Sequence, residues 1–228
     1  MREKKEMGQK IKSTDILRTI IGLLLLFVGF YIMSSIDLHI GYVQEFTLLI
    51  FSIVGVTVIF GNQALIWFSK PQGRYTKIAI ACLIINTIWS MLGGTIVALI
   101  FGNSGNHANA VFGDYIMIFF VPFMIMGEEL FSIGILETLR TKWGLPTMIS
   151  TLVTSVIFGL IHFNTYHGGN VLRTIIQILL VQGVARLIFN YAYLKTSSIW
   201  TSYAVHLVFD LVFLFVLLVV LVVGKYTS

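Results

Sequence analysis

Five ionisable side chains in the second half of the chain lie inside apolar stretches and are of types suited to acid–base chemistry. Glu128 and Glu129 are adjacent in FFVPFMIMGEELFSIGIL, His162 lies in SVIFGLIHF, and His206 and Asp210 lie in SYAVHLVFDLV. A charge near the centre of a bilayer costs about 2.5 to 3.5 kcal/mol or more, so such groups usually face a partner or a water-filled cavity. The pattern therefore predicts a buried polar site.

The spacing within each pair indicates how the side chains are arranged. His206 and Asp210 are four residues apart, so on a helix they share one face and can converge on one point. Glu128 and Glu129 differ by about 100° around a helix, so both cannot aim at the same atom. We expect one glutamate to act and the other to orient a neighbour or to bond elsewhere.

His162 follows Phe158 by four residues and lies on the same helical face. Gly159 stands between them and would let a neighbouring helix approach closely. A single intramembrane histidine is often only a hydrogen-bonded core residue. The two carboxylate-bearing segments nearby favour a functional role for His162.

The elements that position these groups are predicted to be transmembrane helices. The chain is 57% hydrophobic and 11% charged, with a mean hydropathy of +0.92, whereas soluble domains carry about 25% charged residues. Runs of about 20 apolar residues can cross a bilayer as helices. Such runs occupy residues 16–34, 46–68, 78–101, 115–136, 145–163, 171–194 and 199–223. We predict an all-α polytopic membrane helix bundle with about seven transmembrane helices.

Basic residues are segregated to alternate links, which predicts the orientation of the chain. Twelve of the fifteen Lys and Arg residues fall in the tail to Arg18, the links 69–77 and 140–142, and at Lys195. The links 35–45, 102–114 and 164–170 carry none. Because basic residues stay on the cytoplasmic side, we expect a cytoplasmic N-terminus. The net charge of +5 then reflects topology and anionic lipid, and we expect no nucleic-acid partner.

The depths of the site residues do not agree well when the helix ends are set from hydropathy alone. With ends at Leu139 and Leu145, Glu128 lies about 17 Å and His162 about 25 Å from the cytoplasmic ends of their helices. Convergence of the two side chains then requires a tilt or a longer cytoplasmic start of the second helix.

The three motifs, taken in order, resemble the CAAX protease and bacteriocin-processing family of intramembrane peptidases. That family has EExxxR followed by Gly, then FxxxH, then HxxxN or HxxxD. The stretch GVARLIFNYAYLKTSSIWTSYAVH before the last motif also resembles the family. The resemblance covers residues 121–211, which makes 113–223 the expected catalytic core. Residues 1–112 carry no signature, and we expect one integral-membrane domain over 1–228.

One motif position departs from the family. The arginine expected five residues after Glu128 is Ile133, although the following Gly134 is present. In the family this arginine supports the second glutamate, and losing such support can cost tenfold or more. Arg186 or Arg173 is a candidate to replace it, and Arg186 is favoured because it lies deeper in its span.

The resemblance implies roles for the site residues. Glu128 would activate a water held with His162, while His206 would polarise the scissile carbonyl and steady its oxyanion together with Asp210. Asp210 is also a candidate for orienting His206. Desolvated donors stabilise developing charge strongly, which fits such chemistry. We expect no cofactor, with zinc as an alternative, although no HExxH helix is present.

Three functions are consistent with these residues. The first is an intramembrane endopeptidase acting on a membrane-embedded or lipidated protein or peptide. The second is acyl or amide chemistry in bacterial lipoprotein N-acylation, and the third is a non-enzymatic immunity or regulatory protein with a membrane partner. The resemblance places the chain, as a multi-pass protein, in the cell membrane, namely the bacterial cytoplasmic membrane.

Overall fold

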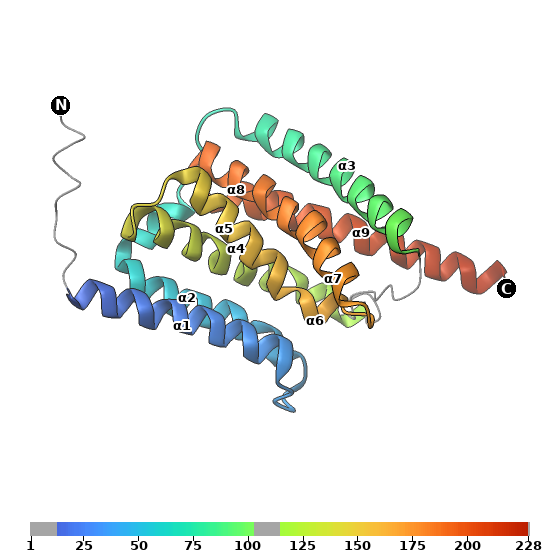
Figure 1. Ribbon diagram of the computed structural model, residues 1–228, viewed down its shortest axis with the longest axis horizontal. Coiled ribbons are helices and arrows are strands. Elements are labelled where there is room, and N and C mark those ends of the chain that lie inside the picture. The colour runs from blue at the N-terminus through green and yellow to red at the C-terminus, as the bar shows by residue number, and fades with distance from the viewer. Residues whose placement is uncertain (1–12, 103–114, 228) are drawn as a thin grey trace.

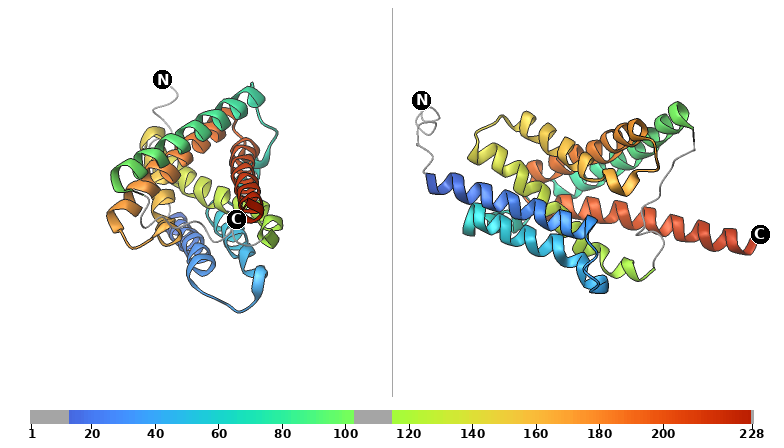
Figure 2. Two further views of the ribbon diagram at one scale, coloured as in Figure 1. Left: turned by 90° about the vertical axis from the view of Figure 1, so that its right-hand side faces the viewer. Right: turned by 60° about the horizontal axis from the view of Figure 1, so that its bottom comes forward.

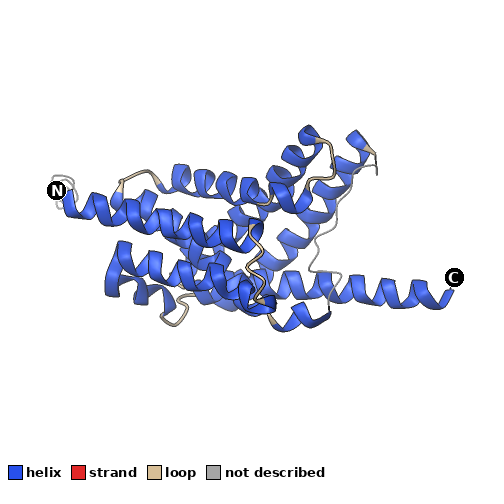
Figure 3. Ribbon diagram, turned by 90° about the horizontal axis from the view of Figure 1, so that it is seen from below, coloured by secondary structure: helices blue, strands red, loops and turns tan. Residues whose placement is uncertain are grey.

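The computed structural model describes residues 13–102 and 115–227, and the regular elements within these two segments are all helical (Figure 3). The predicted all-α fold is therefore confirmed. The longer helices are α1 (Ser13–Ser35), α2 (Thr47–Phe60), α3 (Tyr75–Phe101), α4 (Val121–Glu137), α5 (Thr147–Ile161), α7 (Val171–Ile178), α8 (Val184–Thr196) and α9 (Ile199–Thr227). Shorter helical turns lie at Gly41–Phe46, Gly61–Phe68, Tyr115–Phe119 and α6 (Phe163–Tyr166).

Every predicted apolar run coincides with helix, and several are long enough to cross a membrane. The four described helices that are sufficiently long and apolar are Asp15–Ser35, Gly41–Phe68, Tyr75–Phe101 and Val171–Thr196. Thr147–Ile161 and Ile199–Phe215 are shorter apolar helices. The protein is thus a polytopic helical membrane protein, and seven as the number of spans stays a prediction.

Helix α4 lies at the centre of the bundle. It packs against the hairpin of α1 and α2 and also against α5 and α9 (Figures 1 and 2). Helix α3 packs against α8 and α9, while α5 packs against α8. Gly127 allows the close approach of α2, because a Cβ atom there would lie 2.8 Å from the backbone nitrogen of Leu49. The helix that carries the two glutamates is therefore enclosed by other helices.

Three of the links predicted to be cytoplasmic lie together at one end of the bundle. The α2–α3 link, the α4–α5 link and the α8–α9 turn are found at the same end as the start of α1 (Figure 1). Hydrogen bonds join two of them: Gln72 N donates to the Thr196 carbonyl at 2.9 Å, and Ser198 Oγ donates to the Ser69 carbonyl at 2.7 Å. Residues 1–12, with most of the basic N-terminal tail, and the predicted link over 103–114 lie outside the described residues.

Two helices that position the site are joined by a tight turn. Helix α4 continues as a π-helical turn over Thr138–Lys142, and Gly144 then adopts a φ of +67°, a conformation that favours glycine. Pro146 immediately precedes α5, where its fixed φ suits the entry into a helix. These residues reverse the chain, so α5 runs antiparallel to α4.

Gly159 brings α5 against the helix formed by α7 and α8, as its position in the sequence predicts. A Cβ atom at Gly159 would lie 2.8 Å from the carbonyl oxygen of Ile178. We expect Gly159→Ala to force the helices apart and to lower the free energy of unfolding by about 1 to 3 kcal/mol. Thermal unfolding in detergent measures this change.

Gly94→Ala is the matched control, because nothing lies within 4 Å of the corresponding Cβ position on α3. Alanine is the better helix former, so this variant should be neutral or slightly stabilised. Equal unfolding temperatures for the two variants would show that the α5 contact tolerates a methyl group.

Candidate active site

A buried ion pair joins Glu129 of α4 to Arg186 of α8. The guanidinium donates from Nη1 to Oε1 of Glu129 at 2.6 Å and from Nη2 to Oε2 at 3.2 Å. Both side chains are 0% exposed. The Nε atom of Arg186 donates to Oδ1 of Asn190 at 2.9 Å, one turn along the same helix. The contact is bidentate, the geometry in which arginine binds carboxylates most strongly.

Aromatic rings enclose the arginine on two sides. The guanidinium carbon lies 5.6 Å from the centre of the Phe158 ring and 5.4 Å from that of Phe189. Cation–π contacts of this kind gain strength when water is excluded. Phe158 thus has a definite role in the structure, because it packs against the buried charge that neutralises Glu129.

His206 of α9 is held by the same carboxylate. Its Nδ1 atom lies 3.0 Å from Oε1 of Glu129 and donates to it, and its ring stacks on Phe189 with centroids 4.4 Å apart. The carboxylate therefore holds the His206 ring with Nε2 directed away from the ion pair. Nε2 lies 3.8 Å from Oε2 of Glu128 and 3.8 Å from Oδ2 of Asp210.

Glu128 faces a cavity that Glu129 does not reach. The cavity has a volume of about 100 Å³, and its lining includes Glu128, His162, His206 and Asp210. The side chain of Glu128 is 14% exposed, against 0% for Glu129. The two adjacent glutamates thus point into different surroundings, as their angular separation on a helix predicts.

His162 stands at the end of α5 with its ring oriented by the preceding turn. Its Nδ1 atom lies 2.7 Å from the carbonyl oxygen of Phe158, to which it donates. The rings of Phe158 and His162 are also in contact, with centroids 4.7 Å apart. The second nitrogen, Nε2, is thereby left for the cavity that His162 lines.

The helix ends that the sequence predicted for α4 and α5 were wrong, and the observed ends remove the depth mismatch. The helical backbone after Glu128 continues to Lys142, because a π-helical turn extends α4, and α5 begins only at Thr147. At 1.5 Å per residue, Glu128 lies about 21 Å and His162 about 22 Å from these ends. The two residues therefore reach the same level of the bundle.

The position of the missing motif arginine is occupied by part of the apolar core. Ile133 is fully buried, in a cluster that includes Leu130, Leu136 and Tyr193. It shares the face of α4 with Glu129, four residues earlier. The charged partner of Glu129 in this structure is Arg186 of α8. The sequence identified Arg186 as a candidate without revealing the contact.

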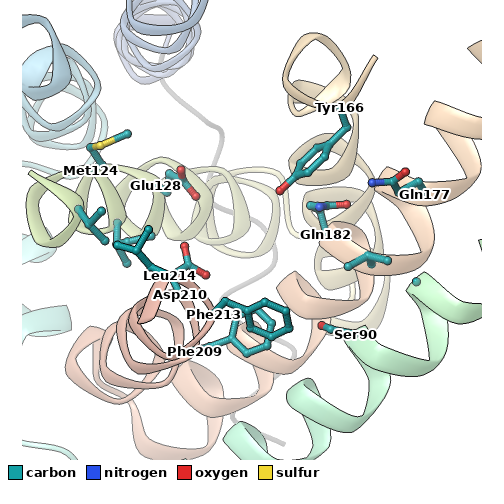
Figure 4. Close-up of a pocket in the computed structure, with 14 residues that line it drawn as sticks. Ser90, Met124, Glu128, Tyr166, Gln177, Gln182, Phe209, Asp210, Phe213 and Leu214 are labelled. Carbon is teal, nitrogen blue, oxygen red and sulfur yellow. The ribbon is translucent and has the colours of Figure 1, made fainter. Parts of the chain in front are cut away.

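A larger cavity adjoins the smaller one and opens between α3, α4, α7 and α9. Its volume is about 300 Å³, and Glu128, Tyr166, Gln182, Asp210 and Ser90 line both cavities. Figure 4 shows Glu128 and Asp210 on one side and Tyr166, Gln182 and Ser90 on the other. The sequence analysis did not identify Ser90, Tyr166 or Gln182 as site residues. A glutamine in the apolar run ILLVQGV was the one signal available.

Within residues 13–102 and 115–227, no three His, Cys, Asp or Glu side chains are placed to hold one metal ion. Both carboxylate oxygens of Glu129 face Arg186, and one of them also accepts from His206.

The fold and the site together define a helical membrane protein with a buried carboxylate–histidine centre. Residues 111–212 match the sequence model of the family described as type II CAAX prenyl endopeptidase Rce1-like. The resemblance drawn from the motifs is thus confirmed over that segment, which supports a CAAX-type intramembrane endopeptidase in general. No significant match to this chain was found among the curated proteins or among the solved structures.

Proposed function

We propose that the protein is an intramembrane endopeptidase in which Glu128 activates the water that cleaves a peptide bond of a membrane-associated or lipidated protein. The observation that carries this proposal is the unequal placement of the glutamates. Glu128 lines both cavities, whereas Glu129 is bound by Arg186 and His206. A general base must reach the proton that it removes, and only Glu128 of the two faces space that admits water.

The roles of the other groups follow from their positions around Glu128. Water held between Glu128 and His162 attacks the scissile carbonyl carbon while Glu128 takes its proton. The Nε2 atom of His206 is 3.8 Å from Glu128 and from Asp210, beyond hydrogen-bond length. The carbonyl oxygen of the substrate approaches Nε2 from the cavity side. His206 polarises it as the imidazolium, in which Nδ1–H donates to Glu129 and Nε2–H donates to the carbonyl oxygen. The C–N bond then breaks, and Glu128 returns the proton to the leaving amine.

Glu129 and Arg186 act through His206 in this proposal. The Glu129 carboxylate accepts from Nδ1 of His206, which keeps Nε2 aimed at the cavity. Arg186 neutralises that carboxylate with two hydrogen bonds and so holds its position. Partners of this kind typically change activity 10- to 100-fold when they are removed from a metal site, and a comparable effect is expected here.

Mass spectrometry of membrane-protein N termini, from cells carrying the wild-type protein or Glu128→Gln, tests the proposal. We expect cleavage-derived N termini that are present with the wild-type protein and absent with the variant. Lipoprotein N termini lighter by one acyl chain in the variant would instead identify N-acylation. No difference of either kind would overturn both enzymatic functions and favour a non-enzymatic regulatory or immunity role.

Two further expectations belong to the proposal. Activity does not require zinc, which is checked by adding a chelator: a loss that added zinc reverses would contradict this. We expect the protein in a bacterial cytoplasmic membrane, which the family resemblance implies. The concentration of Lys and Arg in alternate links predicts that its N-terminus lies inside. Cysteine labelling of the links from either side of the membrane tests that orientation.

A further inference from the structure

Two polar side chains face the glutamate across the site, and the proposed chemistry does not use them. Ser90 of α3 and Gln182, from the turn between α7 and α8, line both cavities. In Figure 4 they lie on the side of the pocket opposite Glu128 and Asp210. Tyr166 and Gln177 also lie on that side, and most of the other residues that line the larger cavity are apolar.

The backbone around Gln182 departs from a regular α-helix. Residues Leu179–Gly183 form a π-helical turn that separates α7 from α8 within one continuous helix. Such turns occur frequently at functional sites, because the extra residue redirects nearby side chains. The indole nitrogen of Trp89 donates to the Leu180 carbonyl at 2.7 Å, which attaches this turn to α3. Ser90, the next residue after Trp89, lines the same cavities as Gln182.

Ser90 and Gln182 each have a polar atom that is buried without a partner. Among the described residues, neither Oγ of Ser90 nor Oε1 of Gln182 has a hydrogen-bond partner, and Ser90 is only 8% exposed. Burying a hydroxyl or amide group without a hydrogen bond costs about 1 to 3 kcal/mol. Two such atoms, both on residues that line the cavities with Glu128, indicate a ligand that supplies the missing groups.

We propose that Ser90 and Gln182 form a subsite that hydrogen-bonds the peptide backbone of the substrate next to the bond that is cut. This inference rests on the proposed endopeptidase function and adds that the site recognises the backbone amide groups of its substrate. A peptide entering an apolar cavity must pair its N–H and C=O groups. Oε1 of Gln182 accepts a backbone N–H, and the Ser90 hydroxyl donates to a backbone carbonyl or accepts an N–H.

The subsite also assigns a role to the N-terminal half of the chain. Ser90 lies outside residues 111–212, the segment that matches the family model. Helix α3 therefore contributes to substrate recognition, while the matched segment supplies the glutamates and histidines. The subsite selects an amide over an ester, because an ester lacks the N–H group that Gln182 accepts.

Binding to protein that carries Glu128→Gln tests this subsite without cleavage. The probe is a fluorescent prenylated peptide ending in a CAAX sequence, compared with a series in which one backbone amide at a time becomes an ester. We expect one ester replacement to weaken binding about tenfold, and Gln182→Met to weaken the amide peptide about equally. In Gln182→Met the same ester should cause no further loss, because the hydrogen bond is already absent.

Serine variants provide the matched controls. Ser90→Ala should weaken binding several-fold, while Ser90→Thr retains the hydroxyl and should largely keep the affinity. Ser52→Ala should bind as tightly as the parent, since Ser52 of α2 is also buried without a partner for its hydroxyl but lines neither cavity. Unfolding temperatures of all variants show that each protein is folded.

The possible outcomes separate this subsite from the proposed reaction. The subsite would be overturned by any of three results. These are additive losses of affinity from the ester and from Gln182→Met, equal affinities in all variants, and no binding of the peptide. Cleavage is measured separately with Glu128 intact. Binding that follows the expected pattern without any cleavage would support the subsite and overturn the endopeptidase proposal alone.

Discussion

Replacing Arg186 with leucine is expected to lower the free energy of unfolding by about 3 to 5 kcal/mol and to lower activity about 10- to 100-fold. The change leaves the carboxylate of Glu129 buried at 0% exposure without its charged partner. It also removes the donor to Asn190 and the cation between the rings of Phe158 and Phe189. Thermal unfolding in detergent, alongside a cleavage assay with the prenylated CAAX peptide, measures both effects.

Two companion variants separate the charge from its geometry. Arg186→Lys keeps a positive charge but loses the planar fork that binds both oxygens of Glu129, so we expect a partial loss of stability and a larger loss of activity. Arg186→Leu combined with Ile133→Arg returns the arginine to the position where the family motif carries it. Recovery of activity in this double variant would show that the two positions serve one carboxylate. Full activity of Arg186→Leu alone would contradict the orienting role of the ion pair.

Sequence patterns were sufficient to predict the helical membrane fold, because hydropathy and helix length depend on local composition. The family resemblance implied that Glu128, His162, His206 and Asp210 would meet, and the four-residue spacing of His206 and Asp210 placed that pair on one helical face. The levels at which they meet could not be predicted from the same patterns. The π-helical turn after Glu137 lengthens α4, and no property of the sequence LETLRTK identifies such a turn.

Contacts between residues far apart in the chain could not be predicted from the sequence either. Arg186 is 57 residues from Glu129, and the choice between Arg186 and Arg173 depended on how α8 packs on α4. Ser90 is similar, because a serine within a span is usually only a helix contact. Its place in the cavity depends on the packing of α3 against the turn that contains Gln182. If the proposed subsite is correct, substrate binding depends on α3, which carries no motif of its own.

The two adjacent glutamates are expected to respond in opposite ways to the same conservative change. Glu128→Gln should reduce kcat by about 10² to 10⁴, the usual contribution of a general base, and leave the unfolding temperature nearly unchanged. Glu128 makes no bidentate contact to Arg186 and faces the cavity, so a neutral amide fits there. Glu129→Gln should lower the unfolding temperature as well as activity, because it leaves the buried Arg186 without an opposite charge.

A purified protein in nanodiscs allows both quantities to be measured on the same preparation. Initial rates of peptide cleavage give kcat and KM, and heating followed by intrinsic tryptophan fluorescence gives the unfolding temperature. The informative result is the difference between the variants, since both remove one carboxylate from the same helical turn. If Glu129→Gln kept its stability and lost as much activity as Glu128→Gln, the division into a reacting and an orienting glutamate would be wrong. Cleavage by Glu128→Gln at the wild-type rate would show that Glu128 is not the general base, because a glutamine amide cannot take the proton of the attacking water.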